Sequence, residues 1–215
     1  MYAFVSGPLV WIAFIVFIGG MIYQLVTMLQ NAKKDKVVYP YVSLKHGIRS
    51  LLHWVVPFAS KNMRMRYEMT IITFVFHLCL ILLPILLTAH VAMFSFAWGV
   101  KWMTVSERTA DWLTVFTVFA LVFFLVRRLM LPEVRFVTSA SDYVLLAIVA
   151  APFLTGFMAH RQWFDYETMI VLHMISGAVM LMAIPFTRLS HMLFFPFTRI
   201  YMGSEFGAVR NAKDW

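Results

Sequence analysis

The chain has little charge and almost no cysteine. Only 13% of its 215 residues are charged and 62% are hydrophobic, whereas a soluble domain is close to half apolar and a quarter charged. The single cysteine, Cys79, excludes an intrachain disulfide and any iron–sulfur or zinc site built from cysteines of this chain alone. No internal repeat and no charge break divides the sequence. These features predict an integral membrane protein with one domain over residues 1–215.

Five apolar stretches approach or exceed the roughly 20 helical residues that cross a bilayer. They predict an all-α bundle of five transmembrane helices, at about 4–29, 67–98, 111–126, 143–159 and 168–195. The first stretch begins almost at Met1, without a basic segment before it or a small-residue cleavage site after it. We therefore expect it to be retained rather than removed as a signal peptide.

The basic residues give the predicted helices an orientation. Of the 18 Lys and Arg, 14 follow the first, third and fifth stretches and Arg188 lies near the end of the fifth, whereas only Lys101, Arg108 and Arg161 lie in the other two connections. Since cytoplasmic loops are rich in Lys and Arg, the N-terminus is expected outside and the C-terminus in the cytoplasm. The net charge of +8 is then explained by topology and contact with lipid, and we expect no nucleic-acid partner.

The first cytoplasmic connection contains an amphipathic pattern. Its apolar residues have the spacing of one helical face, and they are Leu44, Ile48, Leu51, Leu52 and Val55. This predicts a helix lying at the membrane interface, ended by Pro57. His46 and His53 fall on its polar side and are expected to be ordinary surface residues. His160, at the end of a predicted span, is expected to be an exposed interfacial histidine.

Two histidines in the last apolar stretch form the strongest functional pattern. His173 and His191 are 18 residues apart, so one continuous helix would present both on the same face, about 27 Å apart along its axis. This separation is nearly the thickness of the hydrocarbon core. Imidazole is a common axial ligand of haem iron, and polar groups at this depth tend to be functional. The alternative is two hydrogen-bonded histidines inside a helical bundle.

The second predicted span carries two further histidines. His77 and His90 are 13 residues apart, about 20 Å along a helix that runs antiparallel to the fifth. Pairing His77 with His191, and His90 with His173, would hold one haem near each membrane surface. An ideal helix would leave the rings of His77 and His90 about 140° apart. Pro84 lies between them and is expected to disturb the helical register.

Four short motifs occur in an order that is typical of one family of membrane cytochromes. They are Arg127-Arg128-Leu129 with Pro132, Val134, Arg135, Thr138 and Asp142; Leu172-His173 with Gly177; Pro185-Phe186-Thr187-Arg188-Leu189-Ser190-His191; and Phe76-His77. With them, residues 67–210 resemble the gamma subunit of respiratory nitrate reductase. Similar subunits occur in transmembrane redox complexes of sulfate reducers. The family's second histidine on the His77 helix comes three residues earlier than His90, where this chain has Leu87.

The resemblance implies a subunit of an oxidoreductase complex in the inner membrane of a bacterium or archaeon. By this resemblance His77, His173 and His191 are axial ligands of two stacked b haems, and His90 is the fourth candidate ligand by its position on the second span. Menaquinol or ubiquinol would be oxidised near the outer haem, and electrons would pass to a cytoplasmic iron–sulfur subunit. This chain would supply the quinone half-reaction only, and other subunits would carry the remaining chemistry.

Three further positions are candidates for this function. Gly177, one turn after His173, either leaves room for a flat macrocycle or packs helices together. Arg188 either pairs with a haem propionate or anchors the chain at the lipid surface. Arg108 is the foremost candidate for the quinol site, with Lys101 and Asp111 beside it on the expected outer side. Each of these three charged residues also fits an ordinary loop position.

A non-redox function is the competing interpretation. The chain would then be a membrane anchor or a transporter subunit, in which the histidines are structural or relay protons. Transporters often contain inverted repeats, and none is evident in this sequence. A visible absorption spectrum separates the two functions, because a b-type cytochrome absorbs and an anchor without cofactor does not.

Overall fold

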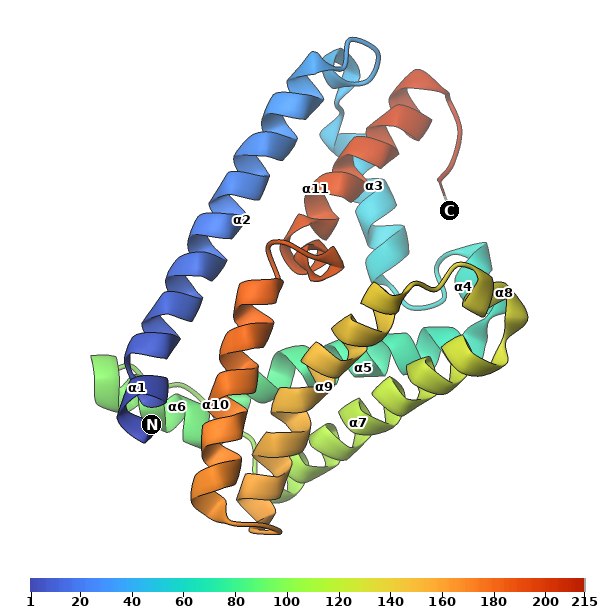
Figure 1. Ribbon diagram of the computed structural model, residues 1–215. Coiled ribbons are helices and arrows are strands. Elements are labelled where there is room, and N and C mark those ends of the chain that lie inside the picture. The colour runs from blue at the N-terminus through green and yellow to red at the C-terminus, as the bar shows by residue number, and fades with distance from the viewer. Residues whose placement is uncertain (215) are drawn as a thin grey trace. The chain divides into compact units, whose positions relative to one another are not determined.

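The chain is helical throughout in a computed structural model that describes residues 1–214 (Figure 1). No strand occurs in this range, which confirms the all-α prediction. The α-helices are α1 (Tyr2–Ser6), α2 (Pro8–Lys34), α3 (Leu44–Val55), α4 (Lys61–Met65), α5 (Tyr67–Leu86), α6 (Thr88–Trp98), α7 (Glu107–Met130), α8 (Pro132–Phe136), α9 (Ala140–Arg161), α10 (Tyr166–Ala183) and α11 (His191–Ser204). The shorter turns are η1 (Tyr39–Tyr41), η2 (Arg188–Ser190) and the π-helical η3 (Glu205–Val209).

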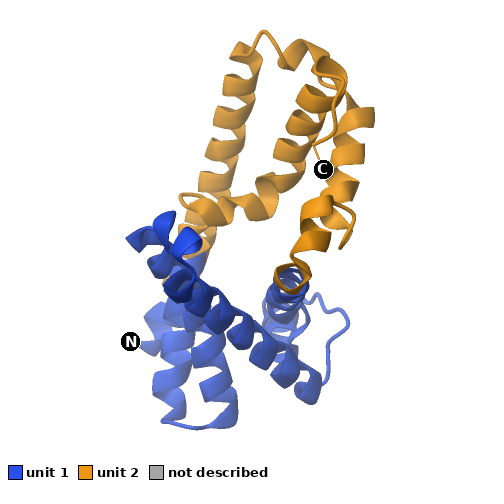
Figure 2. Cartoon of the chain, turned by 90° about the vertical axis from the view of Figure 1, so that its right-hand side faces the viewer, with its two compact units in different colours: residues 1–6, 71–180 blue, residues 7–70, 181–215 orange. Residues whose placement is uncertain are grey.

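The helices group into two compact units, coloured separately in Figure 2. The first unit comprises residues 1–6 and 71–180, and the second comprises residues 7–70 and those from 181 onward. Each unit therefore combines segments that are distant in the sequence. The interpretation of residues 1–215 as one domain stays a prediction.

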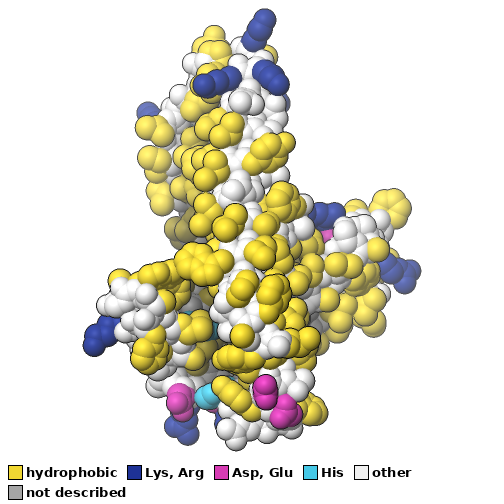
Figure 3. Space-filling model, turned by 60° about the vertical axis from the view of Figure 1, so that its left-hand side comes forward, with side chains coloured by type: hydrophobic (Ala, Val, Ile, Leu, Met, Phe, Trp, Pro, Cys, Tyr) yellow, Lys and Arg dark blue, Asp and Glu magenta, His cyan; other side chains and the backbone are white. Residues whose placement is uncertain are grey.

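Five segments of the described chain are long and apolar enough to cross a membrane. They are Tyr2–Lys34, Tyr67–Trp98, Glu107–Met130, Ala140–Arg161 and Tyr166–Ala183. Large hydrophobic side chains are exposed along them, and they cover most of the face that Figure 3 shows. Such exposure suits helices surrounded by lipid rather than water. By length and composition the chain is a multi-pass membrane protein, as predicted, while its orientation stays a prediction.

The prediction of one continuous helix through residues 168–195 is wrong. Helix α10 ends at Ala183, a turn covers residues 184–187, and the next α-helix begins only at His191. Pro185 explains the break, because proline lacks an N–H and disfavours helical geometry in the residue before it. The carbonyl of Ala183 accepts instead from the Thr187 hydroxyl at 2.8 Å. The five-turn relation between His173 and His191 therefore does not hold.

The second predicted span is also divided. Helix α5 ends at Leu86, and α6 begins at Thr88 after an extended Leu87 with φ −68° and ψ 128°. The break follows Pro84 within one helical turn, as expected for an interior proline. The angle of 140° between His77 and His90 assumed one straight helix and does not apply here.

Helix α3 is observed over the residues predicted for the amphipathic helix. Its apolar side chains Leu44, Ile48, Leu52 and Val55 are exposed. Its other face packs against α11 within the second unit. The close approach needs glycine, because a Cβ at Gly203 would lie 2.6 Å from the carbonyl oxygen of His46. The position of α3 at a membrane interface stays a prediction.

The motif from Arg127 to Asp142 joins α7 to α9, which pack against each other in the first unit. Asp142 is only 4% exposed and accepts from the backbone N–H and the hydroxyl of Ser139, at 2.8 and 2.9 Å. Arg128 lies 3.7 Å from this carboxylate and donates to the Thr138 hydroxyl at 3.2 Å. A buried carboxylate requires such partners. These motif residues therefore fix the start of α9.

Candidate functional site

Two of the four predicted ligands face each other in the first unit. The ring centroids of His90, on α6, and His173, on α10, are 6.0 Å apart, and the ring planes deviate by 13° from parallel. With a metal–imidazole bond of about 2 Å, two imidazoles that bind one metal ion from opposite sides have centroids roughly 6 Å apart. The spacing of this histidine pair is therefore compatible with a shared axial position.

Backbone carbonyls orient both rings. Nδ1 of His90 is 3.0 Å from the carbonyl oxygen of Pro84, and Nδ1 of His173 is 2.8 Å from that of Pro152. Because a carbonyl can only accept, each Nδ1 carries the proton and each Nε2 keeps its lone pair. A hydrogen bond from the second ring nitrogen to a carbonyl is usual for histidines that bind metals. Nε2 is thus the atom of each ring that is available to iron.

The carbonyl that holds His90 belongs to the last turn of α5. The last four carbonyls of an α-helix accept no hydrogen bond from within the helix. At the end of α5, however, each of these four carbonyls has a donor. The pairs are Leu87 N with Leu83 O (3.1 Å), His90 Nδ1 with Pro84 O (3.0 Å), Trp102 Nε1 with Ile85 O (2.7 Å) and Val105 N with Leu86 O (3.0 Å). All four carbonyls at this helix end therefore have donors, and one of these hydrogen bonds sets the position of His90.

Two glycines shape the space around His173. A Cβ at Gly156, on α9, would lie 2.8 Å from Nδ1 of His173, so a larger residue there would displace the ring. Gly177, one turn further along α10, has no described neighbour within 4 Å of the place of its Cβ. A glycine that packs two helices together would have atoms in contact there. Open space beside the histidine pair suits a flat group lying against α10.

The other two predicted ligands lie in different units. His77, on α5, bonds through Nδ1 to the carbonyl oxygen of Thr73 at 2.7 Å, and His191 bonds to that of Arg188 at 2.6 Å. Both therefore also keep the Nε2 lone pair. His53 makes the same kind of bond, to Arg49 at 2.8 Å, so the bond alone does not identify a ligand. The pairing of His77 with His191, and the propionate contact of Arg188, stay predictions.

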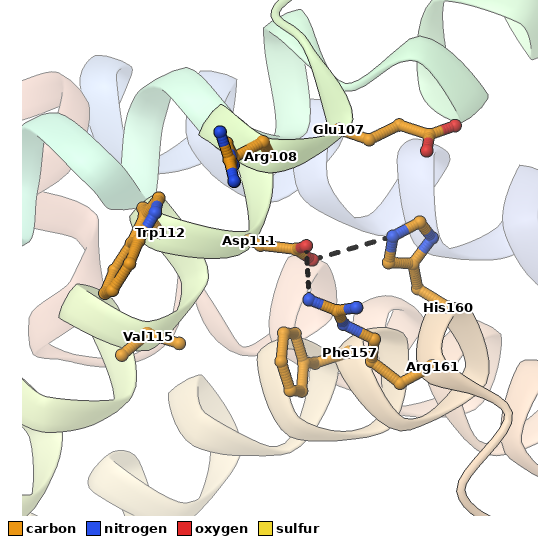
Figure 4. Close-up of a pocket in the computed structure, with 8 residues that line it drawn as sticks. All are labelled: Glu107, Arg108, Asp111, Trp112, Val115, Phe157, His160 and Arg161. Carbon is orange, nitrogen blue, oxygen red and sulfur yellow. Dashed lines mark hydrogen bonds and ion pairs between the residues drawn. The ribbon is translucent and has the colours of Figure 1, made fainter.

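A cleft of about 550 Å³ opens between the start of α7 and the end of α9 (Figure 4). Its lining residues are Glu107, Arg108, Asp111, Trp112, Val115, Phe157, His160 and Arg161. Two of the three charged residues predicted for the quinol site, Arg108 and Asp111, are thus brought together. Lys101 lies in the link before α7 and does not line this cleft.

The cleft contains a charge cluster that the sequence did not indicate. Asp111 accepts a hydrogen bond from Arg161 at 2.6 Å and lies 3.6 Å from Nε2 of His160. The Arg161 guanidinium also lies over the Phe157 ring, 5.6 Å from its centroid. His160 is exposed, as expected, but it is part of this cluster rather than isolated. Asp111 and Arg161 are 50 residues apart on different helices, so only the packing of α7 on α9 reveals their contact.

The fold and its apolar helices define the class, a multi-pass helical membrane protein. Among known proteins, the chain is 34% identical over 215 residues to a curated protein of Nitratidesulfovibrio vulgaris (strain Hildenborough) whose name, Protein, states no activity. The match covers 98% of this chain and 95% of the relative, so the chain belongs to the family of that protein. No family model and no solved structure matches the chain.

Proposed function

We propose that this protein is a dihaem b-type cytochrome subunit of a respiratory redox complex. It exchanges electrons between the membrane quinone pool and an iron–sulfur partner subunit. The observation that carries this proposal is the pair His90 and His173, whose rings lie 6.0 Å apart within 13° of parallel. The resemblance of residues 67–210 to the nitrate reductase gamma subunit supports it independently.

The residues of the first unit fit a b haem. His90 and His173 would bind the iron through Nε2, since their Nδ1 atoms are bonded to Pro84 and Pro152. Gly177 leaves room for the macrocycle beside α10. A bound haem supplies one-electron transfer within the membrane. The residues of this chain hold the ligating nitrogens in place and surround them with apolar helices that exclude water.

A second haem would be held by His77 and His191. Both rings have a protonated Nδ1 and an available Nε2. Arg188, three residues before His191, would pair with a propionate of this haem. With the N-terminus outside, this second site lies on the cytoplasmic side, where the iron–sulfur partner would receive the electrons.

The same orientation places the cleft of Arg108 at the outer surface, where a quinol would be oxidised. Arg108 would orient the quinol by hydrogen bonds to its oxygen atoms. The cleft is close to the first histidine pair along α9. His160 follows Pro152, whose carbonyl holds His173, by eight residues, or about 12 Å.

Location in a bacterial or archaeal inner membrane follows from the same proposal. Helix α3 would then lie on the cytoplasmic surface of the bilayer. Its exposed side chains Leu44, Ile48, Leu52 and Val55 would enter the lipid. The basic residues around it would face the anionic headgroups.

The test is the haem content of purified protein. Reduced protein is expected to show b-type absorption bands and to release two non-covalent haems per chain, because one cysteine cannot make a CxxCH attachment site. His90→Ala and His173→Ala should each remove one haem and leave the other. His53→Ala is the matched control, because His53 has the same Nδ1 bond but is no proposed ligand.

Two results would contradict the assignment. Wild-type protein without haem bands would indicate an anchor or transporter subunit with structural or proton-relay histidines. A haem that survives both His90→Ala and His173→Ala unchanged in amount and spectrum would show that this pair binds none.

A further inference from the structure

The charge cluster in the cleft contains groups that the proposed electron path does not use. Figure 4 shows Asp111 of α7 between Arg108, on its own helix, and the side chains of His160 and Arg161, which reach toward it from α9. Asp111 is 18% exposed, while the side chains of His160 and Arg161 are 46% and 48% exposed. The carboxylate is thus mostly covered, and the side chains of His160 and Arg161 reach water.

We infer that His160 and Asp111 form the proton acceptor of a quinol site in this cleft, with Arg161 as a positioning residue. This inference rests on the proposed function, because it assigns the fate of the protons that quinol oxidation must release. It adds His160, which the sequence placed as an ordinary interfacial histidine, to the functional residues.

The lining of the cleft suits a quinol ring. Trp112, Val115 and Phe157 supply an apolar and aromatic surface, and the charged residues supply hydrogen-bonding groups. The volume of about 550 Å³ falls within the range of about 300–1,000 Å³ that is usual for small-molecule sites. The head group of a quinol likewise combines a flat apolar aromatic ring with two polar hydroxyls.

The residues of the charge cluster have different roles in the proposed proton transfer. Arg161 donates to Asp111 at 2.6 Å, which stabilises the charged carboxylate and fixes its position. Histidine is a side chain that takes up and releases protons near neutral pH. An imidazolium at His160 would lie 3.6 Å from the Asp111 carboxylate and be stabilised by it. Since His160 is half exposed, it can pass a proton on to water.

Two more charged residues line the cleft, Glu107 and Arg108. Glu107 adds one negative charge to the cleft, and Arg108 adds one positive charge. Together with Asp111 and Arg161, these charges set the field at His160, two negative and two positive. The cleft as a whole is therefore neutral before His160 takes a proton.

The proposed step conserves atoms and charge. Oxidation of one quinol to a quinone breaks two O–H bonds and releases two protons and two electrons. Under the proposed function, two oxidised b haems would take up these electrons one at a time, the first of them at the pair His90 and His173. His160 accepts each proton in turn from a quinol hydroxyl and releases it to the outer solution.

Stopped-flow reduction of the haems by a menaquinol analogue tests this role on the full-length, haem-loaded protein. His160→Gln should slow reduction at saturating quinol by roughly 10²-fold, the usual lower contribution of a general base. Half-saturation, haem content and the oxidised spectrum should be unchanged. The dependence of the rate on pH between about 5 and 8 should disappear with the imidazole. His53→Gln is the control and should behave as the wild type does.

Arg161 is tested by its effect on the pH profile. Arg161→Gln should shift the pH profile, because Asp111 loses its hydrogen-bond donor, and Arg161→Lys should restore much of the wild-type profile.

An unchanged rate and pH profile in His160→Gln would overturn the inference while leaving the cytochrome proposal intact. Wild-type haems that are reduced by dithionite but not by quinol would instead contradict the proposed quinone function. Loss of quinol reduction on changes near Arg188 alone would place the site at the opposite surface and overturn both assignments to this cleft.

Discussion

The two compact units use their polar side chains in different ways. In the first unit, side chains bond to carbonyls of the apolar helices, as His173 of α10 does to Pro152 and Trp102, in the link between α6 and α7, does to Ile85. Within a bilayer no water is present to satisfy a carbonyl, so each such bond removes a cost of several kcal/mol. In this unit, polar side chains therefore complete the helices.

In the second unit, His53 and His191 also bond to carbonyls, but pairs of polar side chains join distant segments of the chain. The Tyr201 hydroxyl donates to Asp35, and Asp214 accepts from Ser50 and lies 3.7 Å from Arg199. These contacts join the end of α2, helix α3, helix α11 and the C-terminal segment. A change in the first unit is therefore expected to affect stability and, under the proposed function, haem content, whereas a change in the second unit is expected to affect stability and ionisation.

The largest effect on stability is expected from Gly203→Ala in the second unit. The new Cβ would lie 2.6 Å from the carbonyl oxygen of His46 and from Cβ of Ser50, so α3 and α11 would have to separate. Overpacking of this kind costs roughly 1–3 kcal/mol, and contact with backbone favours the upper end. Thermal unfolding in detergent would show a lower Tm.

Gly19→Ala is the matched control for this change. No described atom lies within 4 Å of the place of its Cβ, on α2. Alanine is a better helix former than glycine, so this variant should keep or raise the Tm. Equal losses at Gly19 and Gly203 would mean that the crossing of α3 and α11 is unimportant for stability.

Gly156→Ala tests the effect of overpacking at a glycine in the first unit. Its Cβ would lie 2.8 Å from Nδ1 of His173 and push the ring away from the carbonyl of Pro152. We expect a loss of about 1–2 kcal/mol and, under the proposed function, loss of the haem between His90 and His173. The Tm and the haem-to-protein ratio would be measured together. A normal haem content would contradict the role of Gly156 in orienting His173.

Trp102→Phe removes a single hydrogen bond, from the indole N–H to the carbonyl oxygen of Ile85. The expected destabilisation is about 1 kcal/mol, the usual net contribution of one hydrogen bond. Because the same helix end holds His90, a small shift of the b-type absorption band is expected as well under the proposed function. Trp163→Phe, in the first unit, provides the comparison. Identical behaviour of the two variants would show that the carbonyl of Ile85 does not depend on Trp102.

The smallest effect concerns ionisation in the second unit. Burial, the hydrogen bond to Asp35 and the nearby carboxylates together raise the pKa of Tyr201 to about 12. Asp35→Asn removes the charge and should bring this pKa back toward the ordinary value of about 10. An alkaline titration of tyrosinate absorbance should then show one tyrosine ionising earlier than in the wild type. Superimposable titrations would exclude this coupling.

The sign of the linked stability follows from the same shift. Folded protein holds the Tyr201 proton at a pH where the unfolded chain has lost it. The contribution of Tyr201 to stability is therefore fully present below about pH 10 and is lost as the pH rises through about 12. Asp35→Asn should reduce this loss.

The sequence predicts the helical elements well because they depend on local composition. The five apolar stretches are observed as five candidate spans, and the amphipathic pattern after Leu44 is observed as α3. The break after Ala183 was missed, although Pro185 was a local signal for it. Apolar content alone does not distinguish one long helix from two helices joined by a turn.

Contacts between distant residues lie beyond such reasoning. Nothing local connects Trp102 with Ile85, or His160 with Asp111, because both contacts depend on how the helices pack. The proximity of His90 and His173 was proposed from the sequence, and the structure brings these rings to 6.0 Å. The hydrogen bonds from these rings to the carbonyls of Pro84 and Pro152 could be recognised only in the structure.

The break at Leu87 also resolves a problem of length. A straight helix over the 32 residues from Tyr67 to Trp98 would be about 48 Å long, far more than the hydrocarbon thickness of about 30 Å. The 20 residues of α5 alone match that thickness, at about 30 Å. Helix α6 therefore does not have to cross the hydrocarbon core, and it does not have to tilt to avoid hydrophobic mismatch. A change in bilayer thickness would therefore be met by the tilt of α5, and His90 would follow α5 through its hydrogen bond to the carbonyl of Pro84.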